Sequence, residues 1–232
     1  MDCPISNRCN RYGSVTCSES FPYVNCFLKN KILSTFKESG LPLRYYDEIH
    51  LRCNRSHVDF EAYQQLHSIQ QKVNEFAYQG KAVFIYSRNK GNGKSSWACK
   101  LLREFIIRFF VQNPEEHPPL FIDMRRFFSE FHPKSWSQTD YVQKIIRDVY
   151  DSPLVVWDDI FFNYQEDIEK INWLSSVIET RILNLKSNIY TSNTNPRQEG
   201  LEDVLGSALY SRVLRTCEMV EFNGADRRCS IK

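Results

Sequence analysis

The sequence predicts an α/β protein with a parallel five-stranded sheet flanked by helices. Five short apolar segments recur along the chain, and each has the length of a buried strand. Stretches with apolar residues at helical spacing separate these segments, which is typical of a parallel sheet covered on both faces. The chain has 232 residues, enough for one such domain and a small appendage.

The expected elements alternate from residue 27 onward. A short helix is expected over 27–36, before Gly40 and Pro42, and a longer helix over 58–78, before Gly80. Residues 40–53 are interpreted as a connector. The expected strands are 82–86, 119–122, 154–157, 188–192 and 218–222, and the helices between them are 94–111, 141–149, 166–185 and 205–214. Because ligands bind at the C-terminal ends of parallel strands, the segments after the strands are the place to look for a site.

Composition excludes several classes of protein. The formal net charge of +2 is too small for a general nucleic-acid coat, so any contact with DNA must come from a local patch. No apolar run approaches the ~20 residues that cross a bilayer. The N-terminus lacks the charged-then-apolar layout of a signal peptide, so a cytoplasmic location is expected.

A glycine-rich segment follows the first expected strand and reads SRNKGNGKSS, residues 87–96. A phosphate-binding loop asks for Gly, four residues and then Gly-Lys-Ser/Thr. Gly93, Lys94 and Ser95 fit the end of this pattern, and Ser87 is interpreted as the replacement of the first Gly. Small residues would let backbone N–H groups wrap a triphosphate, while Lys94 reaches the β- and γ-phosphates and Ser95 holds Mg²⁺. We expect ATP to be bound by Gly91, Asn92, Gly93, Lys94, Ser95 and Ser96. The alternative is a turn that merely links a strand to a helix.

Polar residues end two further expected strands. The apolar segment LVVW is followed by Asp158, a candidate ligand of Mg²⁺, and by Asp159, a candidate for polarising the attacking water. The fourth strand, expected between the first and the third, is followed by Asn193, which would face the γ-phosphate. An ordinary turn before Pro196 explains Asn193 equally well on local grounds.

The order of SRNKGNGKS, LVVWDD, YTSNTNP and LYSRVLRTCEMVEFNGADRR resembles the AAA+ ATPases of the DnaC/DnaI helicase-loader type, phage-encoded versions included. The IstB-type transposition ATPases are close relatives. The resemblance covers roughly residues 44–228. It implies Walker A roles for Lys94 and Ser95, the Walker B role for Asp158 and the sensor 1 role for Asn193. Asp159 stands where the family usually has Glu and is one methylene shorter, so slow ATP turnover is expected.

Two arginines acquire roles only through this resemblance. Arg212, in YSRVL, matches the arginine finger that reaches a neighbouring subunit's ATP. Arg228, in GADRR, matches the sensor 2 arginine, with Arg227 as the alternative. Without the resemblance, Arg212 would be read as a surface residue of an amphipathic helix. The resemblance also implies a domain without the C-terminal helical lid of many AAA+ proteins.

The start of the chain differs in composition from the rest. Residues 1–45 are expected to form a small Cys-rich N-terminal domain, and residues 46–232 the ATPase domain. Four cysteines (Cys3, Cys9, Cys17 and Cys26) fall in a segment too short to bury a core, and together they would suit one tetrahedral Zn²⁺ site. Their spacing lacks the common C-x₂-C pair, so an iron–sulfur cluster or unligated thiols remain alternatives. Loaders of this type have a small N-terminal domain that grips the helicase, some with zinc, so residues 1–45 are expected to bind the helicase.

The segment MRRFFSEFHPKSW combines basic and aromatic residues. In the family, single-stranded DNA is contacted from the inner face of an ATPase spiral. The candidates for this contact are Arg125, Arg126, Phe131, Lys134 and Trp136, the basic ones for phosphates and the aromatic ones for bases. The alternative is a short helix with phenylalanines in the core and arginines on its solvated face.

These observations together predict an ATP-dependent loader of a replicative hexameric helicase, acting in the initiation of DNA replication. Its partners would be the helicase, single-stranded DNA and further copies of the chain, joined through the ATP interface. Two alternatives remain: an IstB-like transposition regulator and a nucleotide-gated adaptor that does not hydrolyse ATP.

Overall fold

The computed structural model describes residues 27–111, 117–135, 137–160, 167–197, 202 and 205–226. Within these residues, five parallel strands form one sheet in the order β2-β3-β4-β1-β5. The strands are β1 (Ala82–Tyr86), β2 (Leu120–Asp123), β3 (Leu154–Asp158), β4 (Ser187–Ser192) and β5 (Cys217–Glu221). The predicted parallel five-stranded α/β fold is confirmed, and β4 lies between β1 and β3 as expected.

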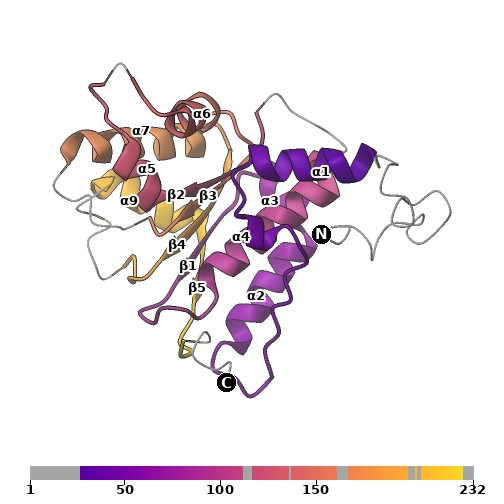
Figure 1. Cartoon of the computed structure of the whole chain (residues 1–232). Helices are drawn as coiled ribbons and strands as arrows, with labels where there is room; N and C mark the ends of the chain where they lie inside the picture. Colours follow the sequence, from indigo (N-terminus) through magenta and orange to yellow (C-terminus); the bar gives the residue numbers. More distant parts are fainter. Residues whose placement is uncertain are drawn as a thin grey trace.

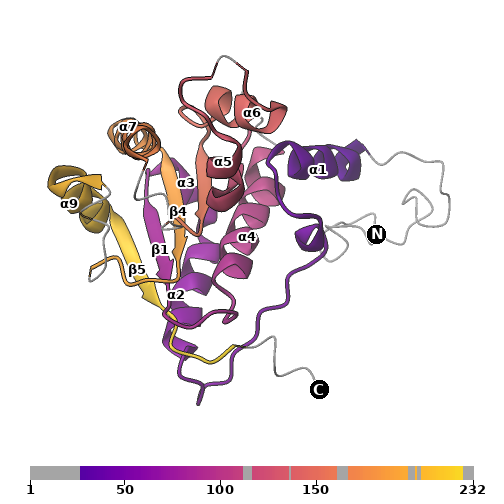
Figure 2. The ribbon, with the colours of Figure 1, turned by 60° about the vertical axis from the view of Figure 1, so that its left-hand side comes forward.

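Helices cover both faces of the sheet (Figures 1 and 2). One face carries α1 (Phe27–Glu38), α2 (Phe60–Gln71), α3 (Val73–Tyr78), α4 (Lys94–Phe105) and its π-helical continuation η2 (Ile106–Phe110), with the short 3₁₀ turn η1 (Leu43–Tyr45) beside them. The other face carries α5 (Met124–Glu130), α6 (Asp140–Asp148), α7 (Ile168–Leu183) and α9 (Ser207–Thr216).

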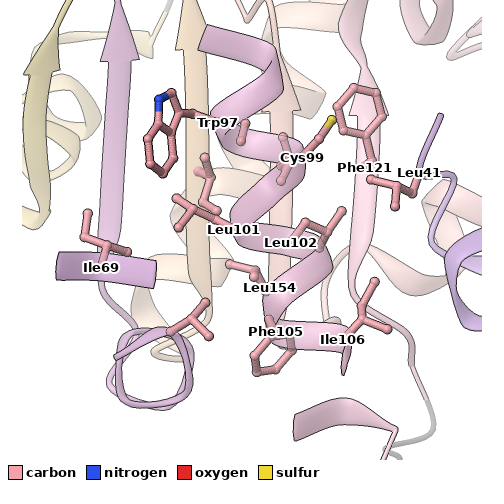
Figure 3. Packing of buried hydrophobic residues seen from close by; sticks show 14 of the residues in the cluster. Leu41, Ile69, Trp97, Cys99, Leu101, Leu102, Phe105, Ile106, Phe121 and Leu154 are labelled. Carbon is pink, nitrogen blue, oxygen red and sulfur yellow. The ribbon is translucent and has the colours of Figure 1, made fainter. Parts of the chain in front are cut away.

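Alternating side chains of the strands feed two hydrophobic clusters. In β1, Val83 and Ile85 pack with α2 to α4, whereas Phe84 packs with the helices of the opposite face. All five residues of β1 are buried, because both faces of a central parallel strand are covered. Figure 3 shows the first cluster, where side chains of α4 lie among residues from several other elements.

Three local features differ from the expected elements. The single helix expected over 58–78 is two helices, because the backbone leaves helical geometry at Lys72 (φ −110°, ψ 28°). The helix that begins at Lys94 widens into a π-helical turn at Ile106. Helix α5 was expected only as the alternative to a DNA-binding segment; it is present, and the carboxylate of Asp123 caps it by accepting from the backbone N–H groups of Arg125 and Arg126.

Helix α1 packs on the same unit as the sheet. Ile32 and Phe36 are buried in the cluster that contains α4. After α1, the carbonyl of Ser39 accepts a hydrogen bond from the backbone N–H of Phe121 at 2.7 Å, so this segment covers the open edge of β2. The described part of the predicted N-terminal domain, residues 27–45, thus packs against the sheet and its helices.

None of the helices in the described ranges is long and apolar enough to cross a membrane.

Candidate nucleotide-binding site

The phosphate loop joins β1 to α4 at the C-terminal edge of the sheet, where the sequence predicts it. Gly91 and Gly93 have φ angles of +73° and +105°, which side chains rarely tolerate. A Cβ on Gly91 would also lie 1.9 Å from Oδ1 of Asp226. Backbone conformation and close approach therefore both require glycine at position 91.

The start of the loop corrects the sequence analysis. Six residues before Lys94, where the pattern has its first Gly, stands Arg88 rather than Ser87. Arg88 is not among the residues with positive φ, so glycine is not needed at this position. Ser87 has another role, because its buried Oγ accepts hydrogen bonds from the backbone N–H of Asn89 at 3.0 Å and from Nδ2 of Asn92 at 2.6 Å. These bonds brace the loop from within.

Lys94 lies within the loop that it is predicted to serve. Its Nζ donates to the backbone carbonyl of Asn89 at 2.9 Å and to Oδ1 of Asn92 at 3.3 Å. The loop opens onto a cleft of about 560 Å³, a volume suited to a small ligand. The cleft is lined by Arg44, Tyr45, Lys90, Gly91, Asn92, Gly93, Lys94, Ser95, Ser96, Arg125 and Asn193.

Asp158, at the end of β3, lies beside hydroxyl groups. The Oγ1 of Thr191 donates to its Oδ1 at 2.6 Å, and the hydroxyl of Ser95 also donates to this carboxylate. Burial raises the pKa of Asp158 because the charged form loses hydration. A carboxylate beside the loop hydroxyl supplies the oxygen ligands that Mg²⁺ prefers.

This arrangement fits a magnesium-bound triphosphate. The glycines leave a cradle beside backbone N–H groups, and Lys94 supplies a cation. In the described part of the chain, no group of three or more His, Cys, Asp or Glu residues could hold a metal ion by itself. Mg²⁺ in nucleotide sites needs no such cage, because it is usually held by one or two protein ligands together with phosphates and water.

Asp159 stands at the centre of a second set of contacts. Its backbone is left-handed (φ +58°), and its N–H donates to Oγ1 of Thr191 at 2.9 Å. Asn193 donates from Nδ2 to Oδ1 of Asp159 at 3.0 Å. Arg125 contacts Oδ2 through Nε at 2.7 Å and Nη2 at 2.5 Å. The structure thus brings together Asp159 and Asn193, and it adds Arg125, which the sequence analysis assigned to DNA.

Other predicted residues lie elsewhere. Arg212 on α9 forms an ion pair with Glu179 of α7. Arg126 pairs with Glu130 at 2.9 Å, and Lys134 pairs with Glu169.

Phe131 does not fit its predicted role of stacking on a base. Its side chain is only 3% exposed and packs against Phe127 and Trp173, because the apolar face of α5 turns into the core. Arg228, Trp136 and the cysteines at positions 3, 9, 17 and 26 lie outside the described residues.

Sequence reasoning missed three residues at this edge. Arg44 and Tyr45 come from the segment interpreted as a connector, yet they line the cleft. The hydroxyl of Tyr45 lies 3.1 Å from Oγ of Ser96, and the guanidinium of Arg44 lies 4.7 Å from the centre of the Tyr45 ring. Thr191 joins Asp158 to Asp159, and its place at the end of the fourth strand was the one available signal.

Comparison with known proteins agrees with the fold. No family model matches the sequence, and no curated protein matches it significantly. The crystal structure of the DnaC helicase loader has a TM-score of 0.58 at 21% identity, over 78% of this chain and 100% of that one. DnaI has a TM-score of 0.59 at 15% identity, over 83% and 100% of the two chains. A candidate primosome component from Streptococcus pyogenes serotype M3 has a TM-score of 0.57 at 19% identity, over 84% and 98%.

These likenesses define the class of fold. The chain has the same fold as the DnaC and DnaI structures, as the resemblance in its sequence implied.

Proposed function

We propose that the protein is an ATP-dependent loader of a replicative hexameric helicase in the initiation of DNA replication. One observation carries the proposal: Lys94, Asp158 and Asp159 lie together at the C-terminal ends of the strands, in a chain that has the fold of helicase-loader structures. The glycine-rich loop supports binding of a nucleotide, and the adjacent acids support the use of Mg²⁺.

The chemistry follows from these side chains. ATP with Mg²⁺ supplies a γ-phosphoryl group that water can attack. Lys94 would turn from the Asn89 carbonyl to the phosphates, while Ser95 and Asp158 would hold the metal ion. Asp159 would orient the attacking water and draw off its proton, with Asn193 fixing the carboxylate. Because Arg125 occupies the other oxygen of Asp159, it must loosen its hold before that oxygen can meet water. Slow turnover suits a protein whose product is an assembled complex.

Assembly would involve Arg212 and the N-terminal segment. Arg212 would act as the finger toward the ATP of a neighbouring copy, which requires that it exchange its Glu179 partner for phosphate. Arg228 would serve as the sensor 2 arginine. Residues 1–45 would bind the helicase, with Zn²⁺ on the four N-terminal cysteines as the proposed staple.

Single-stranded DNA would be contacted by Arg126, Lys134 and Trp136, and by Arg125 when it is released from Asp159. The exposed ion pairs of Arg126 and Lys134 are weak enough for a phosphate to replace their carboxylate partners.

A second candidate function is a nucleotide-gated adaptor without hydrolysis. It is favoured by the engagement of both oxygens of Asp159, one by Arg125 and the other by Asn193. ATP turnover measured with single-stranded DNA separates the two functions, since only the loader should show it. An IstB-like transposition regulator would turn over ATP without binding a replicative helicase.

The test is co-purification with hexameric helicases, with and without ATP, for the wild type and Lys94→Ala. We expect ATP-dependent capture of a helicase by the wild type and its loss in the variant. Lys186→Ala is the matched control, because it removes a lysine at the N-terminal ends of the strands, away from the phosphate loop. Helicase capture that is the same for all three proteins with and without ATP would refute the ATP dependence, and no capture would refute the loader.

A further inference from the structure

Asp59 stands at the N-cap of α2 but does not cap the helix. An aspartate at this position usually accepts from the first backbone N–H groups of its helix. Asp59 makes no such side-chain bond, although it is only 1% exposed. Its Oδ1 instead accepts from the backbone N–H groups of Asn223 at 2.7 Å and Gly224 at 2.8 Å. The buried carboxylate thus binds a segment 164 residues away in the sequence, while its Oδ2 lies 3.8 Å from Nδ1 of the neighbouring His57.

That segment, residues 222–226, is here called the C-terminal strap. It leaves β5 at Phe222, whose backbone N–H donates to the carbonyl of Tyr86 at 2.9 Å and whose ring is 1% exposed. The strap passes close to Asp59, because a Cβ on Gly224 would lie 2.3 Å from Oδ2 of Asp59. Asp226 then lies directly against Gly91 of the phosphate loop.

The strap is also tied to the phosphate loop by hydrogen bonds. Nδ2 of Asn89 donates to the carbonyls of Asn223 at 3.1 Å and Gly224 at 3.2 Å. The carbonyl of Asn89 accepts from Nζ of Lys94. A continuous chain of bonds therefore runs from Asp59 through the strap and Asn89 to Lys94.

We propose that Asp59 is a positioning residue for the nucleotide site, acting on the phosphate loop through the C-terminal strap. The inference rests on the proposed binding of ATP at this loop. Asp59 fixes the two backbone N–H groups of the strap, and the strap carbonyls hold the side chain of Asn89. Asn89 in turn fixes the backbone of the first half of the phosphate loop, beside Lys94. A loop held in its binding shape loses less entropy when the phosphates arrive, so affinity rises without a new contact to the ligand. Bonds to a buried carboxylate suit this task because charge-assisted hydrogen bonds are the stronger kind.

The test measures MgATP affinity by calorimetry, and amide hydrogen exchange, for Asp59→Asn, Asn89→Ala and the double variant. Asn89 is exposed, so its variant should fold even where the Asp59 variant is destabilised. Each single variant should bind MgATP about tenfold more weakly. Since both act through one chain of bonds, the double variant should bind no more weakly than the weaker single variant. Exchange should accelerate in residues 87–93 and at the amides of Asn223 and Gly224.

Asp167→Asn is the matched control, because Asp167 caps α7 and accepts from the backbone N–H of Lys170 at 3.2 Å. It should lower thermal stability and leave MgATP affinity unchanged. Unaltered affinity in Asp59→Asn and Asn89→Ala, or effects that simply add in the double variant, would overturn the inference and leave nucleotide binding intact. A wild-type protein that binds no MgATP would instead overturn the proposed function.

Discussion

Strands β3 and β4 have a buried polar network at each end, and the two networks differ in kind. At their N-terminal end, Arg181 is 0% exposed and donates to Oδ1 of Asn188 and to the backbone carbonyls of Val149, Ser152 and Ser187. Trp157 donates to the same oxygen of Asn188 at 3.0 Å. At the C-terminal end, Asp158 accepts hydrogen bonds from hydroxyl groups. Asp159 accepts a hydrogen bond from the amide of Asn193 and forms an ion pair with the half-exposed Arg125.

The Arg181 network stabilises the fold, whereas the acidic network serves the proposed function. The Arg181 network is closed, since several acceptors surround one cation that solvent does not reach. The acidic network meets the cleft through Arg125 and Asn193, and burial raises the pKa of Asp158 because its charged form loses hydration. Such a site lowers the folding stability of the protein, which is typical of functional sites. Substitutions at the two ends should therefore have different signatures.

The largest effect is expected for Arg181→Ala. It leaves several buried acceptors without a donor, so the free energy of unfolding should fall by about 3 kcal/mol or more. Denaturant unfolding measures the loss, and the exposed Arg215→Ala should change stability by less than about 0.5 kcal/mol. A mild effect of Arg181→Ala would show that water can replace the guanidinium.

Asp159→Asn should lower kcat for ATP by about 100-fold, because the amide cannot accept the proton of the attacking water. The KM should change little, since Asp159 is not expected to hold the ground-state nucleotide. Steady-state turnover with single-stranded DNA measures both constants. No turnover in the wild type would favour the non-hydrolysing adaptor, and equal turnover in the two proteins would contradict the role of Asp159.

Asp158→Asn should raise the stability of the nucleotide-free protein by about 1 kcal/mol at neutral pH, because the amide avoids the cost of burying a charge. The pKa of Asp158 is raised above its ordinary value of 3.8, so the folded form holds the proton more tightly than the unfolded form. The contribution of Asp158 to the stability of the wild type is therefore greatest at low pH, and it is lost as pH rises through the raised pKa.

Thermal unfolding between pH 4 and 7 should show the gap between Asp158→Asn and wild type widening as pH rises. The same variant should lose the contribution of Mg²⁺ to nucleotide affinity. A variant less stable than wild type at every pH would contradict the comparison between the two networks.

Leu185→Gly should have the smallest effect. Leu185 and Asp159 are the two non-glycine residues with positive φ in the described part of the chain, and Leu185 lies just before β4 with its side chain 68% exposed. Glycine relieves the left-handed strain but costs entropy, so a gain of about 0.5 kcal/mol is expected. Thermal unfolding measures this gain, and ATP turnover should stay unchanged.

The features predicted from sequence are those encoded by neighbouring residues. Each of the five strands begins and ends within about a residue of its expected bounds, because a short apolar run between turns is a local signal. The glycine-rich loop is local in the same sense. The position of Asn193 followed from strand order, which the alternation of strands and helices largely fixes.

The remaining features depend on contacts between distant segments. Arg125 meets Asp159 across 34 residues, and Tyr45 meets Ser96 across 51. Asp59 reads as an ordinary N-cap until the strap is seen beside it. No periodicity or motif encodes such pairs, since the packing of the helices on the sheet brings them together.

Calorimetric titration of MgATP into the wild type and Lys94→Ala tests the central claim most directly. The wild type should bind one MgATP per chain. The variant should bind at least about 100-fold more weakly, because the charge of the phosphates is left without its cation. Equal affinity in the two proteins would contradict the assignment of the nucleotide to the loop between β1 and α4.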